Sequence, residues 1–249
     1  MKHHEASIPA MTQHFRDTPG VLALFLTGSV ATGTEHEKSD LDGVAVVTPD
    51  FYREKEKLGK TCESIWCKCS YDGGYFDIHY KTKDELIRLA AEGAEPMRNM
   101  FSCARTLFTT DAQLPDIVAQ IPRFQHNEKT AKQLHYYAGL KQNYNYYLNI
   151  CQPTGFARLH AVNRMVFCLY RLILLENDTL FPSIRKVERT VATAPNKPVG
   201  IMELCERLMQ SLTTEDALSL VESYEAWTSY DYPTDFQFIS NHCIDPYEV

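Results

Sequence analysis

The chain has 249 residues, of which 44% are apolar and 23% charged, and its formal net charge is -7. At about 100 to 200 residues per domain, this length predicts one large domain or two modest ones with a real apolar core. The composition is that of an ordinary globular protein, which excludes a disordered, collagen-like or coiled-coil chain. An acidic chain also disfavours nucleic-acid binding, because that affinity comes largely from Lys and Arg displacing counterions. We therefore expect no nucleic-acid partner.

The charge is unevenly spread along the chain. Residues 125–200 carry ten Lys or Arg against four acids, a local charge of +6, whereas residues 201–249 carry one base against ten acids, a local charge of -9. The first of these segments is a candidate surface for an anion, and the alternative interpretation is a solvated helix face.

Signals for export and membrane insertion are missing from the sequence. The first residues lack the apolar run of a signal peptide, and nowhere do about 18 uncharged apolar residues follow one another. We therefore expect a cytoplasmic protein without a membrane partner, and its eight cysteines to be reduced and mostly buried. Cys62, Cys67 and Cys69 cluster, but they lack the paired CxxC spacing of a structural zinc site.

The first half of the chain mixes strand and helix patterns. Residues 21–26 and 41–47 are apolar runs typical of strands buried on both faces. Asp72-Gly73-Gly74 predicts a hairpin between strands 68–71 and 75–80. The other elements predicted before residue 122 are a helix at 6–18 that ends at Pro19-Gly20, a helix at 51–63, a helix at 82–91, a strand at 106–109 and a helix at 111–121.

The apolar period changes to 3.6 near residue 125 and stays there. The helices that it predicts span residues 127–150, 157–177, 182–193, 199–211 and 214–229. We infer an α/β domain over residues 1–122, followed by a helical domain over residues 123–249.

Three acids stand in apolar strand surroundings, where acids are normally avoided. Asp40 and Asp42 share one face of a strand, roughly 6.6 Å apart at a rise of about 3.3 Å per residue. Two carboxylates held this way repel each other, and a divalent cation between them relieves the repulsion. Asp77, between Phe76 and Ile78 of another strand, is a third such acid. Hard oxygen donors of this kind suit one or two Mg²⁺ ions, as used in phosphoryl and nucleotidyl transfer.

Gly28 and Ser29 directly follow the first buried strand. A glycine lets the backbone approach a phosphate, and the serine hydroxyl and the amides of a following helical turn can donate hydrogen bonds to its oxygens. An anion cradle beside a carboxylate metal site is what a nucleoside triphosphate needs.

These residues also match a known pattern. Leu26-Thr27-Gly28-Ser29, ten further residues, Asp40-Leu41-Asp42 and a downstream strand acid at Asp77 resemble the motif of the DNA polymerase β-like nucleotidyltransferase superfamily. The run from Gly28 to Gly33 and on to Ser39-Asp40-Leu41-Asp42, with a helical domain behind, is similar to the small-molecule branch that contains aminoglycoside and lincosamide adenylyltransferases. The resemblance implies an α/β nucleotidyltransferase core with a mixed β-sheet, followed by an all-α domain that clamps substrate or nucleotide.

The resemblance also implies roles for these residues. Asp40 and Asp42 bind both metal ions, Asp77 binds the catalytic metal and is the candidate to take the acceptor's proton, and Gly28 and Ser29 hold the β- and γ-phosphates. Two positions depart from the family. Gly43 replaces a bulky apolar residue, which is expected to loosen the local packing, and the first long helix offers only Glu128, at its start, for the carboxylate that some members use as a base.

Further candidates are less specific. Ser39 and Lys141 complete the predicted nucleotide-binding set, although Lys141, on an apolar helix stripe, either extends its ammonium group to solvent or points at an anion in an interdomain cleft. Arg164 and Arg171 share a helix face with His160 and either point at an anion or are solvated. Lys186 lies in a stretch that weakly resembles the basic stretch in the helical domain of such transferases. Of the tyrosines on the first long helix, at 136, 137, 144, 146 and 147, most are expected in the core and one or two are candidates to stack on a ring. His135 and His160 are expected to be structural.

We therefore predict a Mg²⁺-dependent nucleotidyltransferase. It moves a nucleoside monophosphate to a hydroxyl of an aminoglycoside-like or lincosamide-like small molecule and releases pyrophosphate. The first candidate donor is ATP, which would supply AMP, and the alternative is another nucleoside triphosphate. The alternatives are an AMP-transferring modifier of proteins and a non-catalytic nucleotide-binding regulatory module. The sequence is compatible with a monomer or a homodimer.

Overall fold

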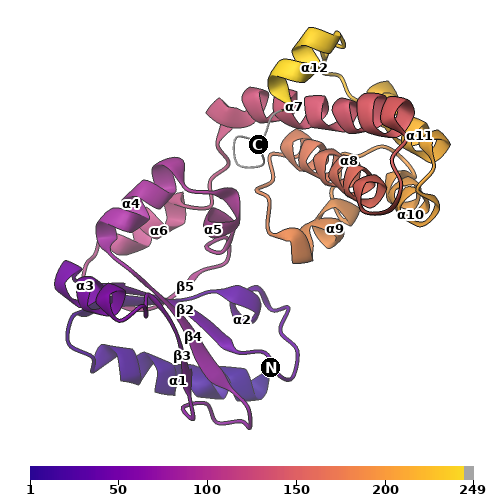
Figure 1. Cartoon of the computed structure of the whole chain (residues 1–249). Coiled ribbons are helices and arrows are strands. Elements are labelled where there is room, and N and C mark those ends of the chain that lie inside the picture. The colour runs from indigo at the N-terminus through magenta and orange to yellow at the C-terminus, as the bar shows by residue number, and fades with distance from the viewer. Residues whose placement is uncertain (244–249) are drawn as a thin grey trace. The chain divides into compact units, whose positions relative to one another are not determined.

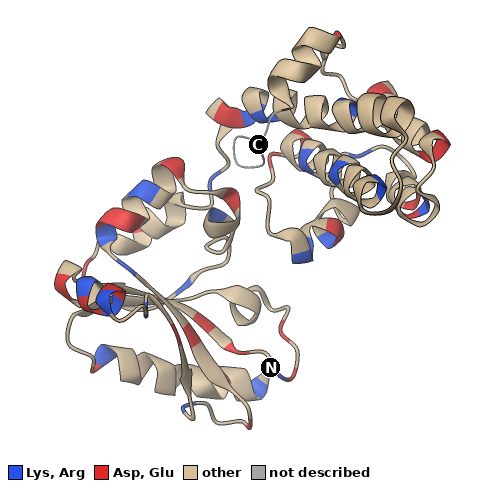
Figure 2. Cartoon of the chain, in the orientation of Figure 1, with Lys and Arg blue, Asp and Glu red and all other residues tan. Residues whose placement is uncertain are grey.

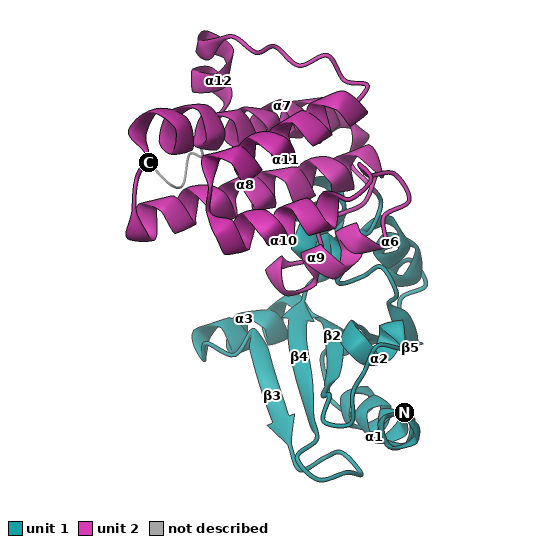
Figure 3. Cartoon of the chain, turned by 90° about the vertical axis from the view of Figure 1, so that its right-hand side faces the viewer, with its two compact units in different colours: residues 1–123 teal, residues 124–249 magenta. Residues whose placement is uncertain are grey.

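The computed structural model describes residues 1–243, and the chain divides into two compact units (Figure 3). Unit 1 comprises Met1–Arg123 and unit 2 comprises Phe124–Val249. Figure 1 shows that unit 1 combines a sheet with helices and that unit 2 is built from helices.

Unit 1 contains a five-stranded mixed sheet in the order β3-β4-β2-β1-β5. Its strands are β1 (Val21–Leu26), β2 (Leu41–Val47), β3 (Cys62–Trp66), β4 (Tyr75–Lys81) and β5 (Arg105–Thr109). Strands β2 and β4 are parallel, and the other neighbouring pairs are antiparallel. The predicted fold class, a mixed-sheet α/β core followed by helices, is confirmed.

Helices cover both faces of this sheet (Figure 1). The helices of unit 1 are α1 (Lys2–Arg16), α2 (Gly28–Thr32), α3 (Pro49–Lys57), α4 (Lys83–Glu92), α5 (Glu95–Asn99) and α6 (Leu114–Gln120). Met11 and Phe15 of α1 pack in one apolar cluster with Leu24 of β1 and Ile78 of β4. A second cluster joins α4 and α6 to the opposite face of β1 and β2. The sheet is therefore the middle layer of unit 1.

The packing at Gly43 of β2 differs from the expectation of a loose site. A Cβ atom built on Gly43 would lie 2.4 Å from Met11 Cε and 3.0 Å from Ile78 Cδ1. The methionine's flexible end thus fills the space that a larger side chain would occupy. The strand is tightly packed here, and the prediction was wrong.

The predicted hairpin is wrong in one of its strands. The partner of β4 is β3, with Trp66 opposite Tyr75, and residues 68–71 form no strand. The helix predicted at 51–63 correspondingly ends at Lys57, before Gly59. The last residues of the predicted helix, 62 and 63, belong instead to β3. This edge strand alternates between exposed and half-buried side chains and therefore lacks the apolar run of a central strand.

Unit 2 is a bundle around α8, whose residues 168–175 are all buried. Its elements are α7 (His126–Gln142), the π-helical segment η1 (Asn143–Cys151), α8 (Gly155–Glu176), α9 (Ile184–Ala192), α10 (Ile201–Ser211), α11 (Thr214–Trp227) and α12 (Phe236–His242). The helix predicted at 127–150 thus changes to the wider π form at Asn143, and the sequence did not predict α12.

The cysteines are free thiols, as predicted, but most of them are not buried. Only Cys168 and Cys205 of the eight are buried, so the prediction of mostly buried thiols was wrong. Between residues 1 and 243, no helix has the length and the apolar composition needed to cross a membrane.

Candidate active site

Two parallel strands bring the three predicted acids together. Asp40 directly precedes β2, and Asp42 is the second residue of this strand. The parallel register places Asp42 opposite Asp77 of β4. Each of the three side chains offers a carboxylate oxygen, and these oxygens all lie within 4.8 Å of one another. Figure 2 shows red acidic positions on the strands of the sheet.

Two hydroxyl groups from the neighbouring strands contact the acids. The Tyr75 hydroxyl hydrogen-bonds to Asp40, and this bond, with desolvation and the nearby charges of the acids, raises the pKa of Tyr75 to about 12. Ser64 Oγ of β3 lies 3.4 Å from Asp77 Oδ1. The sequence pattern predicted neither residue for the site. Tyr75 carried one usable signal, because it lies two residues before Asp77 on the same strand face.

Gly28 is a glycine because of Asp42. Its φ of +67° lies in the left-handed region, and a Cβ atom would lie 1.8 Å from Asp42 Oδ2. Gly28 and Ser29 are the first residues of α2, so their amide groups have no partners within the helix. The structure therefore places Gly28 directly against Asp42 of the acid cluster, with Ser29 next to it in α2.

The loop before β2 holds Asp40 through its neighbour Ser39. The main-chain oxygen of Ser39 accepts hydrogen bonds from the Tyr71 hydroxyl, at 2.7 Å, and from His4 Nε2, at 3.1 Å. The Ser39 side chain is buried, and its Oγ accepts from the main-chain amide of His36. These contacts fix the loop, and the predicted nucleotide contact of Ser39 remains a prediction.

The donor set fits a hard divalent cation. Three carboxylates this close repel one another when all are ionised, and a cation among them relieves that repulsion. Oxygen donors are the ligands that Mg²⁺ prefers. Asp40, Asp42 and Asp77 are therefore the residues that would hold the metal implied by the motif.

Lys141, the remaining predicted nucleotide-binding residue, lies in α7 of unit 2 and is joined to α11. Its Nζ lies 2.8 Å from Glu225 Oε1, and the Tyr137 hydroxyl donates to the same carboxylate oxygen at 2.6 Å. The Lys141 side chain is 13% exposed. The ammonium group thus neither extends freely into solvent nor lacks a partner, and its contact with a nucleotide stays a prediction.

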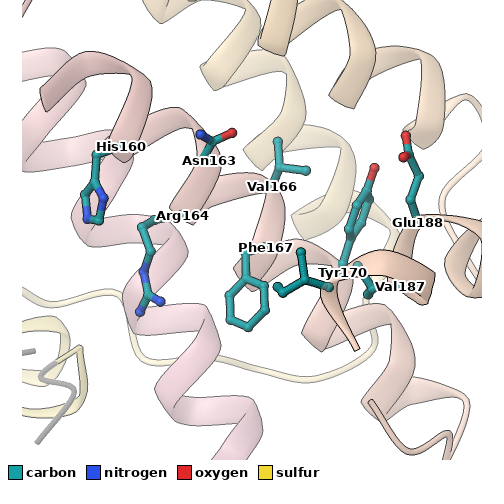
Figure 4. Close-up of a pocket in the computed structure, with 9 residues that line it drawn as sticks. His160, Asn163, Arg164, Val166, Phe167, Tyr170, Val187 and Glu188 are labelled. Carbon is teal, nitrogen blue, oxygen red and sulfur yellow. The ribbon is translucent and has the colours of Figure 1, made fainter. Parts of the chain in front are cut away.

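Unit 2 also contains a cavity of about 510 Å³ between α8 and α9. Phe167 and Tyr170 form part of its apolar wall, and Arg164 and Glu188 bring charge to it (Figure 4). The predicted candidate His160 lines it as well and is exposed. This volume is in the range of small-molecule sites.

The other candidates of unit 2 have structural surroundings. Arg171 is buried, with its guanidinium 4.7 Å from the Tyr136 ring centre and 4.6 Å from that of Phe181, so the solvated interpretation is wrong for this residue. His135 Nδ1 lies 2.8 Å from the main-chain oxygen of His242, as expected of a structural histidine. Lys186 is half-buried on α9. Of the five tyrosines, Tyr137 is in the core, Tyr136 and Tyr144 pack against it, and Tyr146 and Tyr147 are exposed.

One region of the chain matches a known family, and two solved structures are similar to the chain. Residues 10–92 match the family model of the nucleotidyltransferase domain. No curated protein matches the chain. One similar solved structure is a nucleotidyltransferase-like protein from Exiguobacterium sibiricum, with 13% identity and a TM-score of 0.48, over 90% of this chain and 74% of that one. Another is a toxin-antitoxin complex with AMP-PNP, with 16% identity and a TM-score of 0.30, over 49% of this chain and 90% of that one.

The matched region contains the whole acid cluster. Asp40, Asp42 and Asp77, together with Gly28 and Ser29, fall within residues 10–92. The region covers the first four strands of the sheet and the helix that follows β1. Residues 10–92, about a third of the chain, match the nucleotidyltransferase domain, and this match indicates a nucleotidyltransferase.

Proposed function

We propose that the chain transfers AMP from ATP to a hydroxyl group of a small molecule and releases pyrophosphate. Asp40, Asp42 and Asp77 hold Mg²⁺, which, when bound, neutralises charge on the phosphates and polarises the reacting phosphoryl group. Gly28 and Ser29 bind the β- and γ-phosphates through their amide groups and the serine hydroxyl.

The reaction that these residues support is an in-line displacement. The acceptor oxygen forms a bond to the α-phosphorus while the bond from this phosphorus to the oxygen that bridges to the β-phosphate breaks. Pyrophosphate carries away that electron pair, and the acceptor's proton passes to the Asp77 carboxylate. Asp77 belongs to the acid cluster itself, whereas Glu128 Oε2 pairs with Lys132 Nζ at 2.6 Å, which makes Asp77 the better candidate for the base.

One observation carries this proposal: three carboxylates converge within 4.8 Å beside a glycine whose place no side chain can take. Thr27, immediately before that glycine, adds support. It is buried, and among residues 1–243 its hydroxyl has no hydrogen-bond partner. A buried donor without a partner costs free energy, which a phosphate oxygen would offset.

The test compares Asp42→Asn with Asp72→Asn, since Asp72 is an exposed acid outside the cluster. Pyrophosphate release is measured with Mg²⁺, each nucleoside triphosphate, and a panel of hydroxyl compounds that includes glucosamine, kanamycin and lincomycin. We expect Asp42→Asn to lower the rate at least about a thousandfold, because several kcal/mol of charge stabilisation is lost. Asp72→Asn should retain the wild-type rate.

Thermal unfolding gives an independent measure of the metal site. Adding Mg²⁺ should raise the melting temperature of the wild type and of Asp72→Asn, because a ligand that binds the folded state stabilises it. Asp42→Asn should lose this shift. An unchanged rate in Asp42→Asn would refute the proposal, and transfer of label from ATP to proteins of a lysate, with no small-molecule product, would assign the activity to protein modification.

A further inference from the structure

Strands β3 and β4 place an aromatic pair next to the acid cluster. The register sets Ser64 opposite Asp77 and Trp66 opposite Tyr75. Phe76 and Ile78 pack into the cluster that faces α1, so Tyr75 and Asp77 occupy the opposite face of the sheet. Trp66 thus belongs to the row of side chains that borders the acids.

Two contacts connect Trp66 to this cluster. Its ring stacks on that of Tyr75, with centroids 4.4 Å apart and an interplanar angle of 28°. The Tyr75 hydroxyl, in turn, hydrogen-bonds to Asp40. The indole therefore rests on a ring whose hydroxyl is joined to the acid cluster.

The indole is also open to a binding partner. Trp66 is 57% exposed, although a large aromatic ring gains free energy when it is removed from water. It lies on β3, at the edge of the sheet, where no further strand covers it among residues 1–243. An exposed ring that rests on a second ring is the kind of surface on which another ring stacks.

The order of the strands indicates whether the nucleotide or the acceptor lies next to Trp66. Gly28 follows β1, the acids lie on β2 and β4, and Trp66 lies on β3, in the strand order β3-β4-β2-β1. In-line displacement puts the attacking and leaving oxygens on opposite sides of the phosphorus. With pyrophosphate leaving on the Gly28 side, the acceptor hydroxyl must approach from the β3 side.

We propose that Trp66 forms part of the acceptor site and stacks on a saturated, hydroxylated ring of the sugar type. This inference rests on the proposed function, since it needs the triphosphate to lie at Gly28. The face around Trp66 is otherwise polar, with Ser64 on the same strand and the Cys62–His79 pair beyond it, Sγ to Nδ1 3.1 Å. A ring of this type can pack its C–H face on the indole while the hydroxyls on its edge form hydrogen bonds.

Kinetics of Trp66→Ala and Trp66→Phe test the assignment with whichever panel compound supports pyrophosphate release. Trp66→Ala should raise the acceptor KM about tenfold or more, with the KM for ATP within about twofold of wild type, because the apolar contact that is lost is expected to contribute about one order of magnitude in affinity. Trp66→Phe, which keeps a flat ring, should recover most of the loss. Equal changes in both KM values, or no change in either, would overturn the proposal.

Intrinsic fluorescence tests binding without turnover. The chain has two tryptophans, and Trp227 lies in α11 of unit 2, so Trp227→Phe leaves Trp66 as the sole emitter. Glucosamine, kanamycin or lincomycin should change this emission at saturable concentrations, whereas glycerol, which has hydroxyls but no ring, should not. If none of the three ring compounds changes the emission, the proposal is wrong.

The two experiments separate failure of the site from failure of the function. A saturable change in Trp66 emission without any ATP-dependent pyrophosphate release would keep the ring site and refute the transferase reaction assigned to it. Pyrophosphate release with an acceptor that leaves the Trp66 emission unchanged would keep the transferase reaction and refute the ring site at Trp66. A blue-shifted emission that reddens on dilution would show that a second copy of the chain covers the indole, which also overturns the proposal.

Discussion

The acid cluster of unit 1 and the ion pairs of unit 2 place charge in opposite ways. In unit 1, three acids face one another at adjoining strands. In unit 2, basic groups meet acidic ones, with 2.8 Å from Lys129 to Asp178 and 2.8 Å from Lys141 to Glu225. Like charges held together cost free energy unless a counter-ion joins them, whereas opposite charges offset each other. The cluster in unit 1 thus indicates ligand binding, and the pairs in unit 2 stabilise its own helices.

This contrast also changes the interpretation of the local charge of +6 over residues 125–200. Part of that charge is neutralised within the unit, since Lys141 pairs with Glu225, an acid outside the segment; Asp178, the partner of Lys129, is already counted in the sum. The other basic residues of residues 125–200 include those on α8 and α9, which are blue in Figure 2. A sum of charges along the chain therefore overstates what this segment offers to an anion.

After removal of an acid itself, the largest expected effect comes from disturbing the acid cluster through the backbone. In Gly28→Ala, the added Cβ would lie 1.8 Å from Asp42 Oδ2, so this carboxylate must move. We expect pyrophosphate release to fall at least about a hundredfold, because a displacement of about 1 Å at a reacting centre has that effect. Stability should also fall by about 1 to 2 kcal/mol, since alanine disfavours a positive φ.

Gly59→Ala separates the two causes. Gly59 has a similar φ of +64°, but nothing lies within 4 Å of its Cβ position. It should show the loss of stability, measured by denaturant unfolding, and keep the wild-type rate. Equal rates in the two variants would mean that Asp42 tolerates displacement and that the cluster is not the reacting centre.

The sequence predicted the part of this site that lies in continuous apolar strands. The bounds of β1 and β2 match the apolar runs, because strands buried on both faces have no polar alternation to obscure them. The glycine-serine pair and Asp40 and Asp42 follow from local spacing. Asp77 was recognisable as an acid between Phe76 and Ile78.

What could not be predicted depends on pairing between distant segments. The eight-residue connection from Trp66 to Tyr75 hides the β3–β4 pairing, because the Asp72-Gly73-Gly74 turn signal suggests a much shorter loop. The contacts of Ser64 and Tyr75 with the acids need that register. Likewise, nothing in the spacing of Lys141 and Glu225 along the chain indicates their contact.

A moderate effect is expected from removing a charge pair of unit 2. Lys141→Met should lower the free energy of unfolding by about 0.5 to 1 kcal/mol, because the pair with Glu225 is partly shielded from solvent. A double-mutant cycle with Glu225→Gln, measured by denaturant unfolding, should show coupling of similar size. The KM for ATP of Lys141→Met distinguishes a role in stability alone from a role in nucleotide binding. A rise in this KM would show that Lys141 also contacts the nucleotide, as its sequence position predicts.

The smallest effect is a response to pH that differs between the units. Burial lowers the pKa of His4, His14 and His79 below the ordinary value of 6.5, and all three lie in unit 1. As the pH falls below about 6.5, these groups take up protons in the unfolded chain before they do so in the folded one. The unfolded state then binds more protons, so the stability of unit 1 decreases with falling pH.

Hydrogen exchange of the full chain at about pH 7.5 and about pH 5.5, corrected for the intrinsic rates, should detect this loss. Protection should fall for amides of β1, β2 and β4 more than for those of α8. Carboxyl groups contribute little in this window, because Glu63 and Glu85 have pKa values lowered from 4.5 and stay ionised in both states. The buried His4 is the most direct probe, since its Nε2 bond to Ser39 connects α1 to the loop that carries Asp40. His4→Gln should weaken the pH dependence of unit 1, and an equal loss of protection in both units would contradict the assignment to these histidines.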